Sequence, residues 1–238
     1  MQLSRSASTG RDAPSATAVI PALDEEGSIG PVLDAIPRQL VQEVIVVDGG
    51  SRDGTMAAAT VRGVRVLQEH RRGYGRACAL GAAEAHGDVV VFLDADGAAD
   101  PREIGDLLAP IAEGRADLVL GSRLARPVPR GAMPWHQQVG NRLAALFVRL
   151  LYHEALTDLG PFRAVRRSLL AAMPLDDLTY GWPTEMIVRG ARAGWRITEV
   201  PVTCKPRIAG RSKISGTMGG SALAVWHIAR AIVRHARG

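Results

Sequence analysis

Residues 89–96 read VVVFLDAD and combine a strand pattern with two acidic side chains. The five apolar residues are rich in β-branched types, which is typical of a strand buried on both faces of a parallel sheet. Asp94 and Asp96 point to the same side of an extended chain. Because buried charge is costly unless it is paired or bound to metal, they predict a site for a hard cation such as Mg²⁺ or Mn²⁺. The alternative is an Asp-rich turn at a strand end, and spacing alone leaves both open.

Strand and helix patterns alternate from residue 16 to residue 122. Strands are expected at 17–20, 44–47, 64–68, 89–93 and 118–120, and helices at 28–36, 55–62 and 76–85, with a fourth after Asp100. Ser28 and Asp100 are the expected caps of their helices, with Pro101 at the first position of the second. This alternation predicts an α/β domain whose parallel sheet is covered on both faces. Later, less regular patterns indicate helices at 139–152, 183–193 and 220–235 and strands at 162–165 and 197–202.

Composition narrows the class of protein. The chain has 238 residues and a net charge of +5, which favours an anionic partner. Aromatic residues make up 4%, too few for a platform that stacks single-stranded nucleic acid, and we expect no nucleic-acid partner. Cys78 and Cys204 match no metal or redox spacing, which favours a reducing compartment. Residues 1–14 resemble a disordered leader rather than a secretory signal. The sequence has no run of 18 apolar residues, so we expect no transmembrane helix.

Three predicted strands end in acidic segments: 21–25 (PALDE), 48–51 (DGGS) and 94–96 (DAD). Ligands of open parallel sheets bind outside the carboxyl ends of the strands. Together the three ends predict a nucleotide held through its base and ribose, with a cation on its phosphates. For Asp48 the alternative is a simple Asx-turn. The G-x-G at 73–75 lacks a third glycine and follows the third strand, so the dinucleotide fingerprint is excluded, and no P-loop is present.

The ordered segments 20–29 (IPALDEEGSI), 44–55 (VIVVDGGSRDGT), 72–101 (RGYGRACALGAAEAHGDVVVFLDADGAADP) and 117–123 (DLVLGSR) resemble family-2 glycosyltransferases of the GT-A fold. Within that family the match is best to the dolichyl-phosphate mannose synthase-like and polyprenyl-phosphate glycosyltransferase branch. The resemblance covers residues 16–217. It implies a Rossmann-like, mostly parallel sheet in a GT-A domain at 15–217, followed by a C-terminal amphipathic helix at 218–238.

The resemblance also implies roles for individual residues. Asp94 and Asp96 would be the metal-binding D-x-D pair, and Arg123 would contact a phosphate or the sugar. Arg207 and Lys213 would belong to a basic loop that closes over the phosphates. The implied nucleotide-sugar-binding positions are Pro21, Ala22, Leu23, Glu25, Asp48, Gly75, Asp94, Ala95, Asp96, Arg123, Arg207 and Lys213.

The chain departs from the family pattern at three positions. The usual Asn before the glutamate is Asp24, and the second acid of the usual Asp-Asp pair is Gly49. The polar residue that often follows D-x-D as a metal ligand is Ala98. The last change leaves more of the cation's coordination to water and the donor.

The resemblance implies inversion at the anomeric carbon by direct displacement. A divalent cation and positioned Arg or Lys side chains would stabilise the leaving diphosphate, with Asp96 and Arg123 as catalytic residues. A hydroxyl acceptor needs a general base, whereas a lipid phosphate is already ionised. Relatives that act on hydroxyls often carry Glu-Asp where this chain has Glu185-Met186. We therefore expect hexose transfer from GDP-mannose or UDP-glucose to a polyprenyl phosphate.

Other functions stay open at this point. Transfer to a sugar or small-molecule hydroxyl would use Asp158 or Glu185 as the base, although each could instead brace a helix. A non-catalytic nucleotide-sugar binder is less favoured, and transfer from a labelled donor would distinguish it. A nucleic-acid binder is also less favoured, because the basic residues are dispersed over loops and the last helix. A nucleotidyltransferase would need a basic, Gly-rich loop after the first strand, where this chain is acidic.

The last predicted helix is amphipathic and basic. Ala222, Val225, Trp226, Ala229, Ile232 and Val233 fall on one side of a helical wheel, and His227, Arg230, Arg234 and Arg237 fall on the other. This pattern predicts peripheral contact with an anionic membrane, and a cytoplasmic protein held at the cytoplasmic face of the membrane. The alternative is a surface helix packed on the core. The helix at 139–152 could also face lipid, although core packing is favoured there. The oligomeric state is left open.

Overall fold

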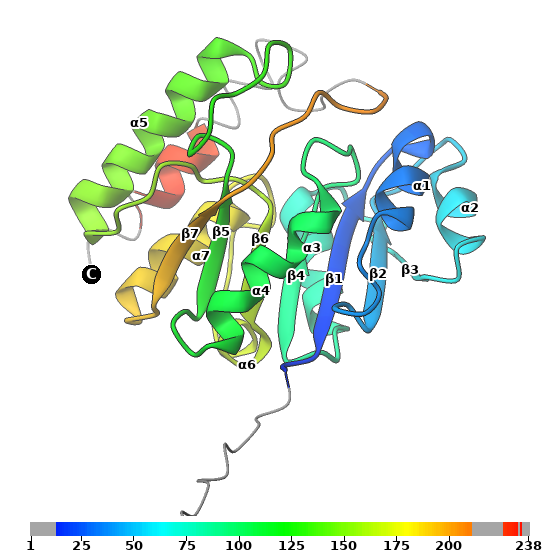
Figure 1. The fold of residues 1–238 in the computed structure, drawn as a ribbon, viewed down its shortest axis with the longest axis horizontal. Coiled ribbons are helices and arrows are strands. Elements are labelled where there is room, and N and C mark those ends of the chain that lie inside the picture. The colour runs from blue at the N-terminus through cyan, green and yellow to red at the C-terminus, as the bar shows by residue number, and fades with distance from the viewer. Residues whose placement is uncertain (1–12, 211–225, 233, 235–238) are drawn as a thin grey trace, which may run out of the picture.

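Seven strands form one sheet in the order β3-β2-β1-β4-β6-β5-β7 (Figure 1). The computed structural model describes residues 13–210, 226–232 and 234. The strands are β1 (Ala16–Ala22), β2 (Glu43–Asp48), β3 (Arg65–Gln68), β4 (Val89–Phe92), β5 (Leu118–Ser122), β6 (Arg163–Arg166) and β7 (Ile197–Pro201). All the strands expected from the sequence are therefore present, within a few residues of their expected bounds.

The sheet is parallel except at β6. This strand pairs antiparallel with β4, where Val90 faces Val165, and antiparallel with β5, where Val119 faces Ala164. Its direction has a consequence for the site. The segment that enters β6 lies at the edge where the other strands end, which is the edge that binds ligands in such sheets.

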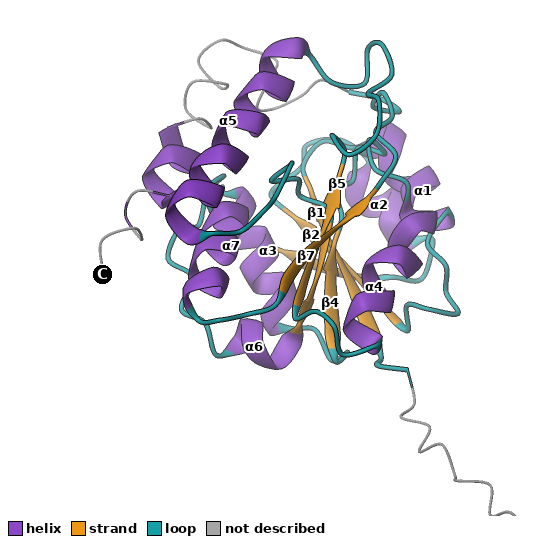
Figure 2. Cartoon of the chain, turned by 60° about the vertical axis from the view of Figure 1, so that its left-hand side comes forward, coloured by secondary structure: helices purple, strands orange, loops and turns teal. Residues whose placement is uncertain are grey.

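Helices cover both faces of the sheet, as the alternating pattern predicted. The helices are α1 (Glu26–Asp34), α2 (Thr55–Thr60), α3 (Tyr74–Ala83), the 3-10 helix η1 (Pro101–Glu103), α4 (Ile104–Ala112), α5 (Trp135–Tyr152), α6 (Arg167–Ala171) and α7 (Trp182–Arg192). Figure 2 shows α1, α2 and α4 on one side of the sheet and α3, α6 and α7 on the other. Residues 226–232 form a further helical segment.

Two hydrophobic clusters form the core, one on each face of the sheet. Alternate residues of one strand enter different clusters, so Val91 belongs to the cluster under α1 and α4 and Phe92 to the cluster under α3 and α7. Phe92 meets Trp182 edge to face, with ring centroids 5.0 Å apart. Burying each side chain of this size contributes about 1.5–3 kcal/mol. The apolar run in β4 thus joins both halves of the core.

The expected helix caps are borne out in one case. Asp100 precedes η1 and its side chain accepts a hydrogen bond from the Arg102 backbone N–H at 3.1 Å. Ser28 is not a cap, because α1 begins at Glu26 and Ser28 lies buried inside it. Both cysteines are buried free thiols, and burial raises the pKa of each. No helix in the described part of the chain is both long and apolar enough to span a membrane.

The two amphipathic helices differ from the expectation. Helix α5 buries Ala145 and Val148, whereas many of its large apolar side chains are exposed, so core packing explains only part of it. In the last helix Ile232 is buried but Trp226 is 53% exposed, so the two do not share one face. The rest of the predicted helix at 218–238, and residues 1–12 of the predicted leader, lie outside the described residues.

Candidate active site

A cavity of about 520 Å³ lies at the carboxyl ends of β1, β2 and β4, a volume in the range of small-molecule sites. Its lining includes eight of the positions predicted to bind a nucleotide sugar. The lining residues are Pro21, Ala22, Leu23, Glu25, Gly49, Arg72, Gly73, Tyr74, Ala77, Asp94, Ala95, Asp96, Thr179, Tyr180, Arg207 and His227. Segments from both halves of the chain therefore meet in one cavity.

The two acids after β4 have different partners. Asp94 Oδ1 accepts a hydrogen bond from the Tyr74 hydroxyl at 2.9 Å. Asp96 Oδ1 accepts from the Ala98 N–H at 2.8 Å, and its Oδ2 accepts from Arg207 Nη1 at 2.6 Å. Burial, followed by the Asp96 charge, raises the pKa of Asp94. Asp96 is thus paired with a guanidinium group, whereas Asp94 is held by a hydroxyl.

This arrangement fits a divalent cation. Asp94 forms no ion pair with any described residue, so the one positive charge of Arg207 leaves the two carboxylates incompletely neutralised. Nowhere in the described ranges do three His, Cys, Asp or Glu side chains gather in a group able to hold a metal ion. The two carboxylates would therefore supply part of a coordination shell, with substrate phosphates and water completing it, as is common for Mg²⁺.

Arg207 links the end of β1 to the end of β4. Its Nη2 donates to Glu25 Oε1 at 2.7 Å while its Nη1 donates to Asp96. Residues 203–208 run beside residues 96–100, and the Ile208 N–H donates to the Asp96 carbonyl at 3.0 Å. These backbone bonds place the start of the predicted basic loop over the cavity. Lys213, the other cation predicted for this loop, lies outside the described residues.

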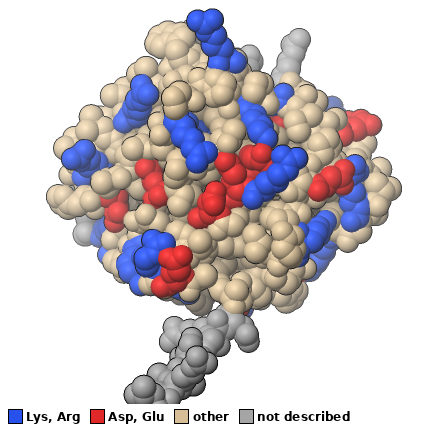
Figure 3. Space-filling model, in the orientation of Figure 1, with Lys and Arg blue, Asp and Glu red and all other residues tan. Residues whose placement is uncertain are grey.

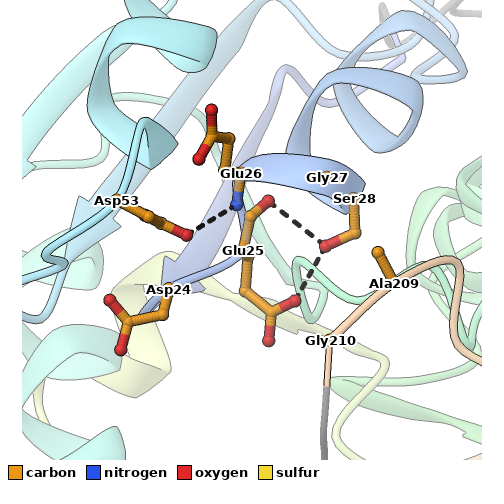
Figure 4. A pocket seen from close by; sticks show the side chains of 8 residues that line it. All are labelled: Asp24, Glu25, Glu26, Gly27, Ser28, Asp53, Ala209 and Gly210. Atoms are coloured by element: carbon orange, nitrogen blue, oxygen red, sulfur yellow. Dashed lines mark hydrogen bonds between the residues drawn. The ribbon is translucent and has the colours of Figure 1, made fainter.

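A second hollow of about 440 Å³ adjoins the first and shares Glu25 with it. Figure 4 shows Asp24, Glu26 and Asp53 around it, with the Ser28 hydroxyl donating to Glu25. Asp24 has φ +49°, in the left-handed region. Asn and Asp tolerate this conformation better than other side chains, so the Asp found in place of the family's Asn keeps the backbone permissible.

Asp48 forms the Asx-turn that was the alternative for its position, and it is absent from the cavity lining. Its Oδ2 accepts from the N–H groups of Gly50 at 3.0 Å and Ser51 at 3.1 Å, which is the expected Asx-turn. Its Oδ1 is buried and has no hydrogen-bond partner among the described residues. An orphaned buried acceptor costs free energy unless a ligand donates to it. Gly49 lines the cavity, and a Cβ there would lie at ordinary contact distance from its neighbours, 3.6 Å from the Ala22 carbonyl oxygen.

Arg123 and Asp158 form a buried pair next to the cavity rather than in its lining. Arg123 Nε donates to Asp158 Oδ2 at 2.7 Å and its Nη2 donates to Oδ1 at 2.9 Å. Burial alone would lower the pKa of Arg123, but the fully buried Asp158 carboxylate raises it above its ordinary value. Asp158 enters the edge of the site because β6 runs backwards. Both of its oxygens are engaged, which does not favour the predicted alternative role as a base.

Glu185 braces a loop instead of facing the cavity. Its Oε2 accepts from the N–H groups of Asp176 at 2.9 Å and Asp177 at 2.7 Å, and its Oε1 lies 2.9 Å from Arg189 Nε. The side chain of Glu185 is 1% exposed. Of the two interpretations of Glu185 that the sequence left open, the structure favours the bracing role.

Gly75 supports the same loop from the other side. A Cβ at Gly75 would lie 2.7 Å from the Asp177 carbonyl oxygen, and the Gly75 N–H donates to the Thr179 carbonyl at 3.1 Å. Gly75 therefore packs on the loop and is absent from the cavity lining. Its predicted role in nucleotide binding becomes one of allowing close approach between α3 and residues 177–179.

Of the lining residues without a predicted binding role, three come from late in the chain: Thr179, Tyr180 and His227. They lie more than 80 residues after the D-x-D pair, in segments with no strand-end motif. Tyr74, which donates to Asp94, was visible in the segment RGYGR but carried no assigned role. Its ring stacks on that of Tyr180 with centroids 6.5 Å apart. A three-dimensional arrangement was needed to join these residues to the site.

Charged side chains are spread over the face of the molecule drawn in Figure 3. Acidic side chains gather across the middle of this face, and arginine and lysine side chains lie singly around them. The basic side chains on this face are thus dispersed rather than collected in one patch.

Comparison with known proteins gives consistent matches. The model of the family described as Glycosyl transferase family 2 matches residues 17–173. An uncharacterized glycosyltransferase of Mycobacterium tuberculosis is 39% identical over 209 residues, which cover 88% of this chain and 94% of the relative. An undecaprenyl-phosphate mannosyltransferase of Micrococcus luteus is 36% identical over 225 residues, which cover 86% of this chain and 89% of that protein.

Solved structures share the architecture. A crystal structure of glucosyl-3-phosphoglycerate synthase from Mycobacterium tuberculosis, in complex with Mn²⁺, uridine diphosphate and phosphoglyceric acid, superposes with a TM-score of 0.78. The two chains are 25% identical, and the match covers 94% of this chain and 79% of the other. The fold is therefore GT-A, as the sequence predicted.

Proposed function

Because the chain belongs to glycosyltransferase family 2, we propose that it transfers a hexose from a nucleotide sugar to a polyprenyl phosphate. The reaction inverts the anomeric carbon and depends on Mg²⁺ or Mn²⁺ held by Asp94 and Asp96. The donor is GDP-mannose or UDP-glucose. One observation carries the choice of acceptor: both carboxylates that could act as the base of a hydroxyl transfer are engaged in ion pairs.

The donor end of the cavity suits a nucleoside diphosphate. The orphaned Oδ1 of Asp48 offers an acceptor for N–H groups of a base, and Gly49 presents no side chain to the base from the cavity lining. Arg207 lies at the D-x-D pair, where a diphosphate would need a positive charge. A bound divalent cation would supply Lewis-acid stabilisation of the leaving diphosphate. The neighbouring crystal structure with Mn²⁺ and uridine diphosphate supports this assignment.

The choice of acceptor follows from Asp158 and Glu185, the two predicted bases, which are both held in ion pairs. An alcohol loses its proton on attack and needs a base nearby, whereas a phosphate monoester is largely ionised near neutrality (second pKa about 6). Asp158 is held by Arg123, and Glu185 is held by Arg189 and two backbone N–H groups. An acceptor that arrives already ionised suits such a site. The relative named as an undecaprenyl-phosphate mannosyltransferase supports this acceptor class.

Helix α5 gives this acceptor a surface to approach. Its exposed apolar side chains recur every three to four residues and therefore share one face of the helix. They are between 44% and 75% exposed and comprise Trp135, Val139, Leu143, Leu146, Phe147, Leu150 and Leu151. Arg142 and Arg149 are exposed on the same helix, which suits anionic head groups around an apolar stripe. We place the membrane contact on α5, with Trp226 of the last helix beside it.

A transfer assay tests the proposal. Labelled GDP-mannose and UDP-glucose are each incubated with Mn²⁺ and either undecaprenyl phosphate or small sugars and phosphoglycerate as hydroxyl acceptors. We expect label in the lipid phosphate fraction and its loss on chelation. Transfer to the hydroxyl acceptors alone, or transfer that survives chelation, would contradict the proposal.

Vesicle binding tests the membrane surface separately. Replacing Leu146 and Phe147 with Glu should release the protein from phosphatidylglycerol vesicles in a flotation assay. Val61 is 78% exposed at the end of α2, and Val61→Glu is the matched control that should leave binding unchanged. Equal binding by all three proteins would remove α5 as the contact.

A further inference from the structure

The last helix brings a histidine into the cavity, and no motif of the family segments contains it. His227 lines the cavity together with Thr179 and Tyr180, on the wall that also holds Asp94. Its side chain is 14% exposed. A histidine on a predicted surface helix would ordinarily face solvent, and the helical wheel placed it with the basic residues. Its position in the cavity therefore calls for an interaction with a ligand or with the wall.

The loop that α7 braces orients this imidazole. Thr179 Oγ1 donates its only proton to Asp177 Oδ1 at 2.5 Å. The same hydroxyl lies 3.0 Å from His227 Nδ1, so it accepts a hydrogen bond from an Nδ1–H group. Asp177 Oδ2 is 3.5 Å from Nδ1. These contacts with Thr179 and Asp177 fix the imidazole ring. Its Nε2 has no hydrogen-bond partner among the described residues.

The same helix also reaches the lipid-facing side. The Tyr152 hydroxyl at the end of α5 donates to the Ile232 carbonyl at 2.5 Å. Trp226, one residue before the histidine, is exposed and stacks under Arg230 at 5.2 Å from its ring centroid. One short helix thus has a cavity-lining residue at its start and a contact with α5 at its end. An acceptor with its chain along α5 would bring its head group towards this helix.

We propose that His227 binds the phosphate of the lipid acceptor through Nε2, with Thr179 and Asp177 as its positioning residues. The inference rests on the proposed function. In the charged ring both nitrogens donate, so Nε2–H bonds a phosphate oxygen while Nδ1–H stays on Thr179. The Asp177 carboxylate lies beside the ring, with Oδ2 3.5 Å from Nδ1. Glu185 then acts on the acceptor indirectly, because it accepts a hydrogen bond from the Asp177 backbone N–H.

Steady-state kinetics of His227→Ala and His227→Gln test the assignment, with GDP-mannose or UDP-glucose, Mn²⁺ and farnesyl phosphate as a soluble acceptor. The alanine variant should raise the acceptor KM roughly 10- to 100-fold, the cost of one hydrogen bond to a charged group. The glutamine variant keeps an N–H donor near the Nε2 position and should recover part of that loss. The donor KM and calorimetric binding of the nucleoside diphosphate should stay within about twofold.

The matched control is His86→Ala. The His86 side chain is 79% exposed and contacts Glu43 at the amino end of the sheet, away from the cavity. A histidine that only ties the helix to the loop would, when replaced, lower the thermal midpoint and weaken donor and acceptor alike. That pattern, or an unchanged acceptor KM in both variants, overturns the inference while leaving the proposed function standing. If the wild-type protein does not glycosylate farnesyl phosphate or undecaprenyl phosphate, the proposed function itself is wrong, and the inference falls with it.

Discussion

The carboxylates in and beside the cavity are held in different ways in the two halves of the chain. In the first half, from β1 to the end of β4, Asp94 has no ion-pair partner among the described residues and one oxygen of Asp48 has no hydrogen-bond partner. In the second half, from β5 onwards, Asp158 and Glu185 are buried and held by arginines. The carboxylates of the first half have bonding capacity left for a ligand, and those of the second half hold its loops in place.

This difference distinguishes carboxylates that can bind a ligand from carboxylates that stabilise the structure. A carboxylate with unused bonding capacity costs stability unless something binds it, which is a mark of a functional site. A carboxylate with every oxygen engaged stabilises the structure and has little left to offer a substrate. Substitutions in the two halves should therefore act on different quantities, and the four tests below run from the largest expected effect on transfer to the smallest.

Asp96→Asn should reduce the transfer rate by roughly 10²- to 10³-fold, because the D-x-D pair loses charge where the leaving diphosphate must be stabilised. Thermal unfolding should change little, since Asn matches Asp in size and its amide oxygen can still accept from the Ala98 N–H. Steady-state transfer at saturating Mn²⁺ measures the effect. Asp106→Asn, at an exposed position of α4, is the control. A variant that keeps more than a tenth of the wild-type rate would remove Asp96 from the chemistry.

Asp158→Asn should lower the free energy of unfolding by about 3 kcal/mol, because it leaves the Arg123 guanidinium buried without its countercharge. Transfer should fall by about tenfold as the edge of the site loses its position. Urea unfolding and transfer assays on the same preparation measure both quantities. A rate loss without any loss of stability would instead identify Asp158 as a base and move it to the ligand-binding half.

Glu185→Gln should keep the transfer rate within about threefold of wild type. The amide oxygen can still accept from the Asp176 and Asp177 N–H groups, but the ion pair with Arg189 is lost. We expect a decrease of about 1–2 kcal/mol in the free energy of unfolding. A large rate loss with hydroxyl acceptors, measured beside lipid phosphate, would show that Glu185 is a base after all.

Replacing Asp117 should change stability without changing the transfer rate. Asp117 lies just before β5, far from the edge of the sheet formed by the carboxyl ends of the strands. Hydrogen bonds from Arg196 lower the pKa of Asp117 to about 2, below an ordinary value of about 3.9. A lowered pKa stabilises the fold above pH 4, and this contribution is lost as pH falls towards 2. At pH 7 the free energy of unfolding of Asp117→Asn should therefore be about 2 kcal/mol below that of wild type. This difference should disappear near pH 2. A difference in unfolding free energy that is the same at every pH would show that the Asp117 charge does not cause the stabilisation.

The sequence predicted the first half of the site well because its signals are local. Buried parallel strands have a continuous apolar pattern, and residues just after them share one edge of the sheet. Asp94, Asp96 and Glu25 could be placed together on that basis alone. Asp24 shows the limit even here, since its left-handed backbone explains why Asp replaces Asn, and no periodicity reveals it.

The second half could not be predicted in the same way. The direction of β6 depends on its two neighbours and not on its four residues, so the segment containing Asp158 gave no sign that it reaches the ligand edge. The helical wheel of the last helix assumed a single apolar face, whereas contacts with α5 and the 177–179 loop rotate His227 inward. Helix α5 carries too many apolar side chains for its contact with α7 to cover.

The paired hydrogen bonds of Arg207 to Glu25 and Asp96 should add to the coupling between a bound dication and a bound diphosphate. A diphosphate that recruits this guanidinium group draws it away from a carboxylate, and that carboxylate then becomes a better ligand for a dication. The dication in turn makes the arginine easier to withdraw. Cation and nucleotide should accordingly enter with positive cooperativity, so that titrating either in the presence of the other gives a tighter dissociation constant than titrating it alone.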